Sequence, residues 1–525
     1  MTLPGDQAVP PRAGIATGLR LADRIALPAW LAVLLLVVSL VPMASVVEID
    51  PDEAIGIEIA RHLLDGRGQY TEIWNDQPPL HPTLLAIGVG AIGLVGGGAA
   101  GELLAGRLIS LLFAMLLAAA LYRELRRETS PVPALVGVLL LIFSYRFVRM
   151  AGAAMMGLPA VTMALAGCWF AVRSVDAAAP RRALAWAAAA GAVIACSWLT
   201  KPIVWFAPIL AGLFVLFSST AAGRWRPLAA MIGGFIAALL VVGTLTSAWN
   251  AFDQVLGTGW GDATREHFAE QDVATRVRYF AERDQALLVM GLLGVPWVAW
   301  TCLRLRPCPP DPSRRPPRSP ARPRIPAGAM AFAWFLAAAM SIAYHRPIWW
   351  HHFLLLSVPL AWLAGYGAEA IWSAVLFGWH RGIGWRALGV VLAATLPLAV
   401  AAGAFNLSGD FVPAHEAGGR PLDDGAVKAL REAPAGPVFV DRLIYATAAR
   451  RAPAPWWTVI TEKRLRSDTT MMNDLAPSLQ ESDIAAVLLA RWEPDYLGDD
   501  FAAWLDGEFI EVYRSDDAAV YIRRE

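Results

Sequence analysis

A cluster of carboxylates follows the first long apolar segment of the chain. Asp50, Asp52 and Glu53 stand almost side by side, and Asp76 and Gln77 follow later in the same polar stretch. Ionised side chains close to the hydrocarbon of a bilayer are costly unless they face water, a partner or a substrate. The position of this cluster therefore predicts chemistry at a membrane surface.

The same stretch has a structural explanation for two of its acids. Asp50 suits the N-cap of a helix, Pro51 the first helical position, and Glu53 the place from which a capping-box acid returns to the cap. Apolar residues at helical spacing follow, which predicts an amphipathic helix over residues 52–65 at the membrane interface. Asp52 is left as the carboxylate for chemistry, although stabilisation of the helix dipole would also explain it.

Composition sets the class of the protein. Of its 525 residues, 57% are hydrophobic and only 17% are charged, and the mean hydropathy is +0.48. This leaves too little polar surface to cover a soluble globule, so we expect a multi-pass membrane protein. The formal net charge of zero gives no reason to expect nucleic acid as a partner. The four cysteines show neither metal-ligand spacing nor a disulfide framework.

Apolar segments and arginines together predict the topology. The run 25–44 is long enough to span a bilayer and follows a polar tail, residues 1–24, which is expected in the cytoplasm. Counting every later apolar segment as a span would put each arginine-rich loop outside, against the positive-inside rule. Laying the glycine-rich segment 82–99 on the outer surface moves all these loops inside. We therefore expect about eleven spans in an inner (plasma) membrane and an extracytoplasmic C-terminus.

The chain is expected to divide into a membrane domain, residues 25–405, and a soluble domain, residues 406–525. The second part alternates short β-rich runs with helical stretches, which predicts a small α/β domain outside the membrane. It contains no phosphate loop, metal-ligand spacing or nucleophile motif. Acceptor recognition and simple bracing of the catalytic loops are both open as its role.

The predicted topology gathers reactive side chains on the outer side of the membrane. They lie in the outer loops 46–81 and 249–285 and at the outer ends of spans. Snorkelling to lipid head groups is an alternative role for the cations among them, and anchoring in an aromatic belt is an alternative for the paired histidines. Besides the acids already named, these side chains are Arg146, Arg149, Lys201, His267, His351 and His352.

Several short motifs occur together in the membrane part of the chain. They are Asp52-Glu53, Ala60, Leu63-Leu64, Gly66, Tyr70, Asp76-Gln77-Pro78-Pro79-Leu80, Arg107-Leu108 and Thr200-Lys201-Pro202. In this combination, over roughly residues 20–405, the chain resembles the GT-C glycosyltransferases of the dolichyl-phosphate-mannose protein mannosyltransferase and aminoarabinose (ArnT-like) transferase group. The resemblance implies an all-α polytopic membrane fold with horizontal helices in the first outer loop and a small outer domain.

The resemblance also implies an activity. It is the transfer of a sugar, with inversion, from a polyprenyl-phosphate donor to a lipid, glycan or protein acceptor at the periplasmic face. Asp52 matches the catalytic aspartate of the family. One base is enough, because the phosphate is already a good leaving group. Lys201 matches a lysine of the family and, with Arg146 and Arg149, could hold the departing phosphate.

The remaining residues of the matched motifs and of the later outer loops are expected to bind substrate. These are Glu53, Asp76, Gln77, His267, His351 and His352. Some relatives bind a metal through residues that Asp76 and His267 could match, so a divalent metal is possible, but the spacing predicts no definite ligand set.

The chain departs from the family at one place. Many relatives carry a second acid just after the third span, where this chain has only small and apolar residues, 151–157. The role of that acid is either unfilled or falls to Asp50, Asp76 or Asp262. The rival interpretation is a transporter or flippase for a lipid-linked sugar. Transporters tend to show internal repeats and charges distributed through the bundle, and this sequence shows neither.

Overall fold

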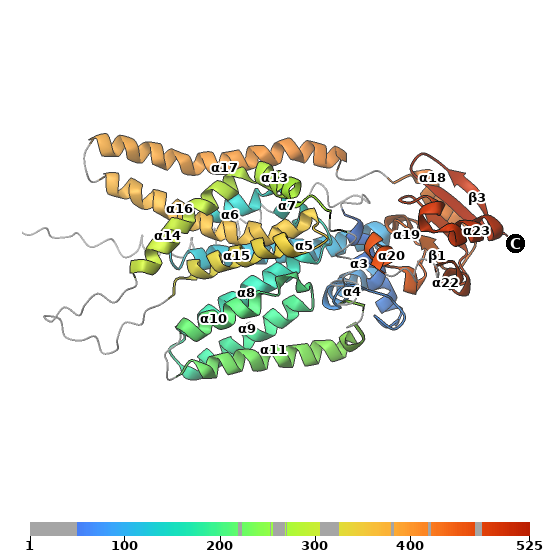
Figure 1. Ribbon diagram of the computed structural model, residues 1–525, viewed down its shortest axis with the longest axis horizontal. Helices are drawn as coiled ribbons and strands as arrows, with labels where there is room; N and C mark the ends of the chain where they lie inside the picture. Colours follow the sequence, from blue (N-terminus) through green and yellow to red (C-terminus); the bar gives the residue numbers. More distant parts are fainter. Residues whose placement is uncertain are drawn as a thin grey trace, which may run out of the picture.

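The protein consists of a long helical bundle with a small mixed domain at one end (Figure 1). Helices α3 (Pro51–Leu64) and α4 (Leu80–Gly93) lie where these two parts meet. The predicted first span, residues 25–44, lies outside the described residues. The structure, a computed structural model, describes residues 50–218, 223–251, 254–255, 268, 270–304, 325–379, 383–417, 422–467 and 475–524.

The bundle is built from apolar helices, as the composition predicts. Seven of the described helices are long and apolar enough to cross a membrane, or eight if the bent pair α6 and α7 forms one span. The count of eleven stays a prediction, because α10 has only 12 residues and residues 25–44 are not described. The bundle helices are α5 (Gly98–Leu125), α6 (Pro131–Ile142), α7 (Tyr145–Ala151), α8 (Gly157–Asp176), α9 (Pro180–Trp198), α10 (Ala207–Ser218), α11 (Trp225–Leu245), α14 (Gln285–Arg304), α15 (Ala327–Tyr344), α16 (Leu354–Trp379) and α17 (Ile383–Ala417).

Helix α4 occupies most of the segment that the sequence placed on the outer surface. Its 14 residues extend over about 21 Å at 1.5 Å per residue, which is short of a hydrocarbon core of about 30 Å. It packs against α3 and α5 rather than joining the row of long helices. Helix α17, in turn, continues past residue 405, where the sequence placed the end of the membrane domain.

The basic connections of the bundle meet at the end away from the mixed domain. Arg127, just after α5, forms an ion pair with Asp176 at the end of α8. The neighbouring Glu128 accepts a hydrogen bond of 2.8 Å from the backbone N–H of Ala327 at the start of α15. The loop after α5 therefore contacts both the end of α8 and the start of α15, which agrees with the prediction that these connections share one face of the membrane.

Helix α3 starts as the sequence predicts. The side chain of Asp50 caps it by accepting the backbone N–H of Asp52 at 3.1 Å, and Pro51 takes the first helical position. The sequence predicts that only one face of this helix is buried, at the membrane interface, and the structure differs in how much of the helix is covered. Buried side chains occur on several faces of α3, because α5 lies on one side and the mixed domain on another.

Glu53 is expected to return to the helix cap, but its carboxylate is directed at α5 instead. It accepts hydrogen bonds from Arg107, at 2.9 Å from Nε and 3.1 Å from Nη2. It also accepts the backbone N–H of Ala154, between α7 and α8, at 2.9 Å. Both partners of this ion pair are fully buried. The pair therefore joins α3 to two parts of the bundle.

The mixed domain confirms the α/β prediction for the C-terminal part. Its sheet has the order β1-β2-β4-β3, with β1 and β2 parallel and the other neighbours antiparallel. The strands coincide with the predicted β-rich runs; β1, β2 and β4 bury apolar side chains in the core of the domain, whereas most of β3 is exposed. The elements are α18 (Asp424–Glu432), β1 (Val438–Val440), α19 (Ile444–Ala449), η6 (Pro455–Trp457), α20 (Glu462–Ser467), α22 (Leu475–Glu481), β2 (Ala486–Leu489), η7 (Pro494–Leu497), α23 (Asp499–Glu508), β3 (Phe509–Arg514) and β4 (Ala519–Arg523).

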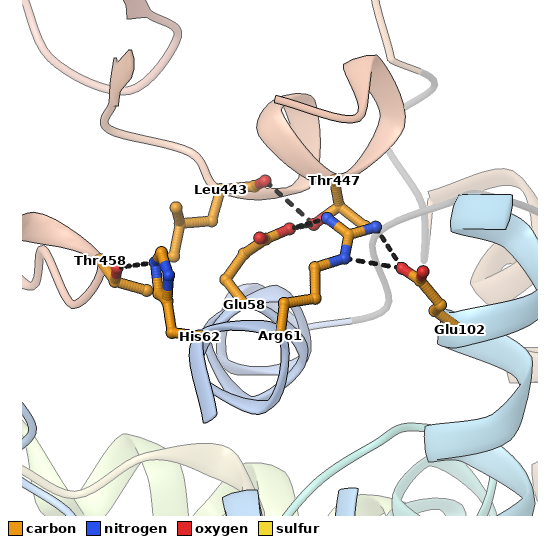
Figure 2. A network of polar contacts seen from close by, with 7 residues as sticks. All are labelled: Glu58, Arg61, His62, Glu102, Leu443, Thr447 and Thr458. Carbon is orange, nitrogen blue, oxygen red and sulfur yellow. Dashed lines mark hydrogen bonds and ion pairs between the residues drawn. The ribbon is translucent and has the colours of Figure 1, made fainter. Parts of the chain in front are cut away.

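A buried polar network joins α3 to this domain and to α5 (Figure 2). Arg61 of α3 forms ion pairs with Glu58 of the same helix and with Glu102 of α5. The hydroxyl of Thr447, in α19, donates to Glu58 at 2.5 Å. Helix α3 is thus held from both sides, and the C-terminal domain has a defined position over the bundle.

We expect the Glu53–Arg107 pair to be essential for the position of α3. In Glu53→Gln, Arg107 would remain charged and buried but would lose this ion pair, and breaking a buried ion pair costs about 3–5 kcal/mol. The apparent Tm of the purified protein in detergent should therefore fall clearly. The control is Glu72→Gln, which breaks an exposed pair with Arg67 and should cost at most about 1 kcal/mol. Equal losses in the two variants would contradict this role.

Candidate active site

A cavity of about 350 Å³ lies where α3, the bundle and the C-terminal domain meet. It brings together six of the predicted site residues, which come from the first outer loop and from the outer ends of bundle helices: Asp52, Asp76, Gln77, Lys201, His351 and His352. The sequence therefore identified side chains that are far apart in the chain and share one cavity.

Two carboxylates at the start of α3 line the cavity. Asp50 is 6% exposed, whereas Asp52 is half-buried. Burial, and secondarily the charge of Asp52, raises the pKa of Asp50 to about 8. Burial thus favours the neutral form of Asp50, whose side chain caps the helix, and Asp52 is the more exposed carboxylate of this turn.

Lys201 reaches the cavity from the turn between α9 and the short helix η2 (Pro202–Val204). Its Nζ lies 3.2 Å from Nε2 of His351, in the short helix η5 (Trp350–Phe353). An ammonium group can only donate, so Nε2 accepts and the proton of a neutral His351 sits on Nδ1. The ring of His352 lies 4.6 Å from that of His351. A cation and two imidazoles thus form the membrane side of the cavity.

Asp76 and Gln77 lie on a loop that is held by hydrogen bonds at both ends. The hydroxyl of Tyr70 donates to the carbonyl of Gln77 at 2.8 Å, and the N–H of Gln77 donates to the side chain of Asn75 at 2.9 Å. Gln254 accepts the backbone N–H of Asn75, also at 2.9 Å. The loop is fixed before substrate arrives, which suits a binding role for Asp76 and Gln77.

A buried arginine of the C-terminal domain supports the same loop. The guanidinium of Arg464 lies 4.1 Å from the ring centre of Trp74, two residues before Asp76. Its Nη1 donates to the carbonyls of Trp456 and Val459 at 2.8 Å. Burial lowers the pKa of Arg464 to about 9, and the charge of Asp76 opposes this fall. The C-terminal domain therefore helps to position the acid that faces the cavity.

The C-terminal domain also forms a wall of the cavity, which sequence reasoning missed. The side chains that it contributes include Val459, Thr461, Glu462 and Arg491. They belong to no motif, and they are spread over the chain between η6 and the turn that follows β2. No local signal could have found them, because only the docking of this domain onto α3 brings them to the cavity.

Three predicted substrate-binding residues are not among the residues that line the cavity. Glu53 is buried in its pair with Arg107. Arg146 is paired with Asp284 at 2.6 Å, and both side chains are 1% exposed. Arg149 lies 4.3 Å above the ring of Trp350 and helps to stabilise the charged form of Asp50. The geometry gives these three side chains structural contacts.

The predicted site residue His267 and the alternative acid Asp262 lie outside the described residues. Within the described part of the chain, no group of three or more His, Cys, Asp or Glu side chains is arranged to hold a metal ion. A metal site that uses Asp76 and His267 stays a prediction.

Comparisons with known proteins agree with this architecture. Residues 76–246, less than half of the chain, match the family Dolichyl-phosphate-mannose-protein mannosyltransferase. No curated protein sequence matches the chain.

Solved structures resemble the protein over almost its whole length. The crystal structure of ArnT from Cupriavidus metallidurans in the apo state has a TM-score of 0.56 at 17% identity and covers 97% of this chain and 98% of its own. The same protein bound to undecaprenyl phosphate has a TM-score of 0.56 at 16% identity, with coverage of 96% and 98%. The apo oligosaccharyltransferase of Archaeoglobus fulgidus has a TM-score of 0.58 at 11% identity and covers 97% and 75%. The chain therefore has the GT-C fold of membrane glycosyltransferases, as the sequence predicted.

The pKa of Asp50 predicts how stability depends on pH. Its folded pKa, about 8, lies above the ordinary aspartate pKa of 3.8, which applies to the unfolded chain, so between these values the native state holds a proton that the unfolded state has lost. The contribution of Asp50 to stability is therefore largest at low pH and is lost as the pH rises to about 8. Asp50→Asn keeps the cap but cannot titrate. The apparent Tm of the wild type minus that of Asp50→Asn should fall from pH 5 to pH 8, and a rise would contradict burial as the cause.

Proposed function

We propose that the protein is a glycosyltransferase that moves a sugar from a polyprenyl-phosphate donor to an acceptor at the outer face of the inner membrane. The observation that carries the proposal is the shared cavity, in which the carboxylate of Asp52 and the ammonium group of Lys201 face one reaction space. The shared fold with ArnT, which has been solved with undecaprenyl phosphate bound, supports a donor of this chemical class.

The reaction follows from these residues. An acceptor hydroxyl attacks the anomeric carbon of the donor sugar from the face opposite the phosphate, and Asp52 takes the hydroxyl proton. The bond from the anomeric carbon to the phosphate oxygen breaks, and its electron pair leaves with the polyprenyl phosphate. Lys201 stabilises the charge that gathers on the phosphate. Attack from the opposite face inverts the configuration of the sugar.

The surroundings of the two side chains suit these roles. Nε2 of His351 accepts a hydrogen bond from the ammonium group of Lys201 and so orients it. The N–H of His351 is then on Nδ1. Asp50 adds no charge beside Asp52 while its raised pKa keeps it protonated. A flippase would need the binding half of this site but no base. Release of free polyprenyl phosphate by the purified protein, measured by mass spectrometry, separates the two functions.

Lys201→Met tests the binding of the donor phosphate. The variant keeps the length of the side chain and loses its charge, and hydrogen bonds to charged groups are worth about 1.5–3 kcal/mol. Donor affinity should fall about tenfold to a hundredfold, and transfer should fall with it. Lys428→Met removes an exposed lysine of α18 and should leave affinity unchanged. A folded Lys201→Met protein with normal donor affinity would assign Lys201 to snorkelling at the lipid head groups.

Asp52→Asn tests the base. It preserves shape and removes basicity, so transfer should fall about 10²–10⁴-fold while donor binding and expression survive. Asp65→Asn, at the exposed other end of α3, is the control and should be active. Near-normal turnover of Asp52→Asn, together with loss of turnover in Asp50→Asn or Asp76→Asn, would move the base to another carboxylate of this loop.

A further inference from the structure

One short segment supplies more of the cavity lining than any other. It is the stretch 345–353, which lies between α15 and α16 and ends with η5. Its His351 accepts a hydrogen bond from Lys201, so the orientation of the ammonium group depends on where the backbone of this segment lies. The lining residues that it provides are His345, Pro347, Trp349, Trp350, His351 and His352.

A glutamine of the second outer loop holds the middle of this segment. The side chain of Gln271 binds both backbone groups of Ile348: its Nε2 donates to the carbonyl oxygen at 3.0 Å, and its Oε1 accepts the N–H at 2.6 Å. Ile348 is fully buried, and buried backbone groups need hydrogen-bond partners. Gln271 meets both needs at once, as a neighbouring β-strand would. It thereby fixes the backbone three residues before His351.

A short helix fixes the position of Gln271 in turn. Gln271 directly precedes Asp272, whose side chain caps α13 (Val273–Arg283). Toward the other end of α13, the ring of Phe280 is stacked on that of Phe353, with the ring centres 5.3 Å apart. Phe353 is the last residue of η5. The two ends of α13 therefore hold the segment on both sides of its paired histidines.

Another glutamine of the same outer loop binds a second wall of the cavity in the same way. Nε2 of Gln254 donates to the carbonyl oxygen of Tyr70 at 3.0 Å, and its Oε1 accepts the N–H of Asn75 at 2.9 Å. Both glutamines thus use a side-chain amide to bind the backbone of a wall. The wall held by Gln271 is the one that carries the histidine bound to Lys201.

We propose that Gln271 is a positioning residue for binding of the donor phosphate. It acts through the backbone of Ile348 on His351, and through His351 on the ammonium group of Lys201. Gln271 does not line the cavity, so its effect on the substrate is indirect. The inference rests on the proposed glycosyl transfer and adds how the phosphate site is held in its shape.

Binding of undecaprenyl phosphate to the purified protein in detergent, measured by microscale thermophoresis, tests this role. Gln271→Met keeps the length of the side chain and removes both hydrogen bonds. The Kd should rise about fivefold to tenfold, which is part of the loss expected for Lys201→Met, because the ammonium group remains but is misplaced. Gln271→Glu loses only the bond to the carbonyl of Ile348 and gives the same test if Gln271→Met does not fold.

A double-mutant cycle separates positioning from a general structural role. In the Lys201→Met background, Gln271→Met should change the Kd less than about twofold, because the group that it positions is already absent. Equal fold-changes in the two backgrounds would overturn the proposal, and so would an unchanged Kd in Gln271→Met itself. The matched control is Gln480→Met, which breaks a 2.8 Å hydrogen bond from an exposed glutamine to Glu508 and should leave the Kd unchanged. A wild type that binds no undecaprenyl phosphate would instead overturn the proposed donor, and this inference with it.

Discussion

The buried ion pair between Glu53 and Arg107 is the interaction on which the rest of this architecture depends. It places two full charges where neither is exposed, and the cost of desolvating them is offset because they bind each other and because Glu53 also accepts the N–H of Ala154. Because Glu53 lies in the first turn of α3, the pair fixes the start of this helix against the bundle. Asp50 and Asp52 are in the same turn, so their positions at the cavity follow from it.

The other side of α3 binds the C-terminal domain and α5. Glu58 and Arg61 are bound by Thr447 of the C-terminal domain and by Glu102 of α5, so the helix connects the soluble domain to the membrane part. This connection holds the domain over the cavity, where the guanidinium of Arg464 packs against the ring of Trp74 and so supports the Asp76 loop. The cavity thus has walls from three parts of the chain, and displacement of α3 would disturb all of them. Of the two roles left open for this domain, bracing agrees with its contacts to α3 and to Trp74.

The cations of the outer side show why residue type alone does not assign a function. Arg146, Arg149 and Lys201 were all candidate phosphate ligands, since each follows or ends an apolar segment, and the matched motif favoured Lys201. Arg146 instead pairs with Asp284, which lies 138 positions further along the chain, and stacks among aromatic rings. No pattern in the sequence links those two residues. Lys201 meets His351 in the cavity, 150 positions away, and the matched motif was the reason to prefer it.

The sequence by itself determined the features that depend on local pattern: the membrane class, the cap of α3, the strands and helix α18 of the C-terminal domain, and the motif residues Asp52, Asp76 and Lys201. These follow from composition, spacing and a resemblance that act over short stretches. The tertiary structure decided what depends on contacts between distant segments. In the folded protein Glu53 binds Arg107 instead of the helix cap, and α3 is covered on several sides. Arg146 is paired with Asp284 and does not line the cavity, whereas Glu462 and Arg491 do. A buried charge must find a partner somewhere in the fold, and local spacing cannot say which one.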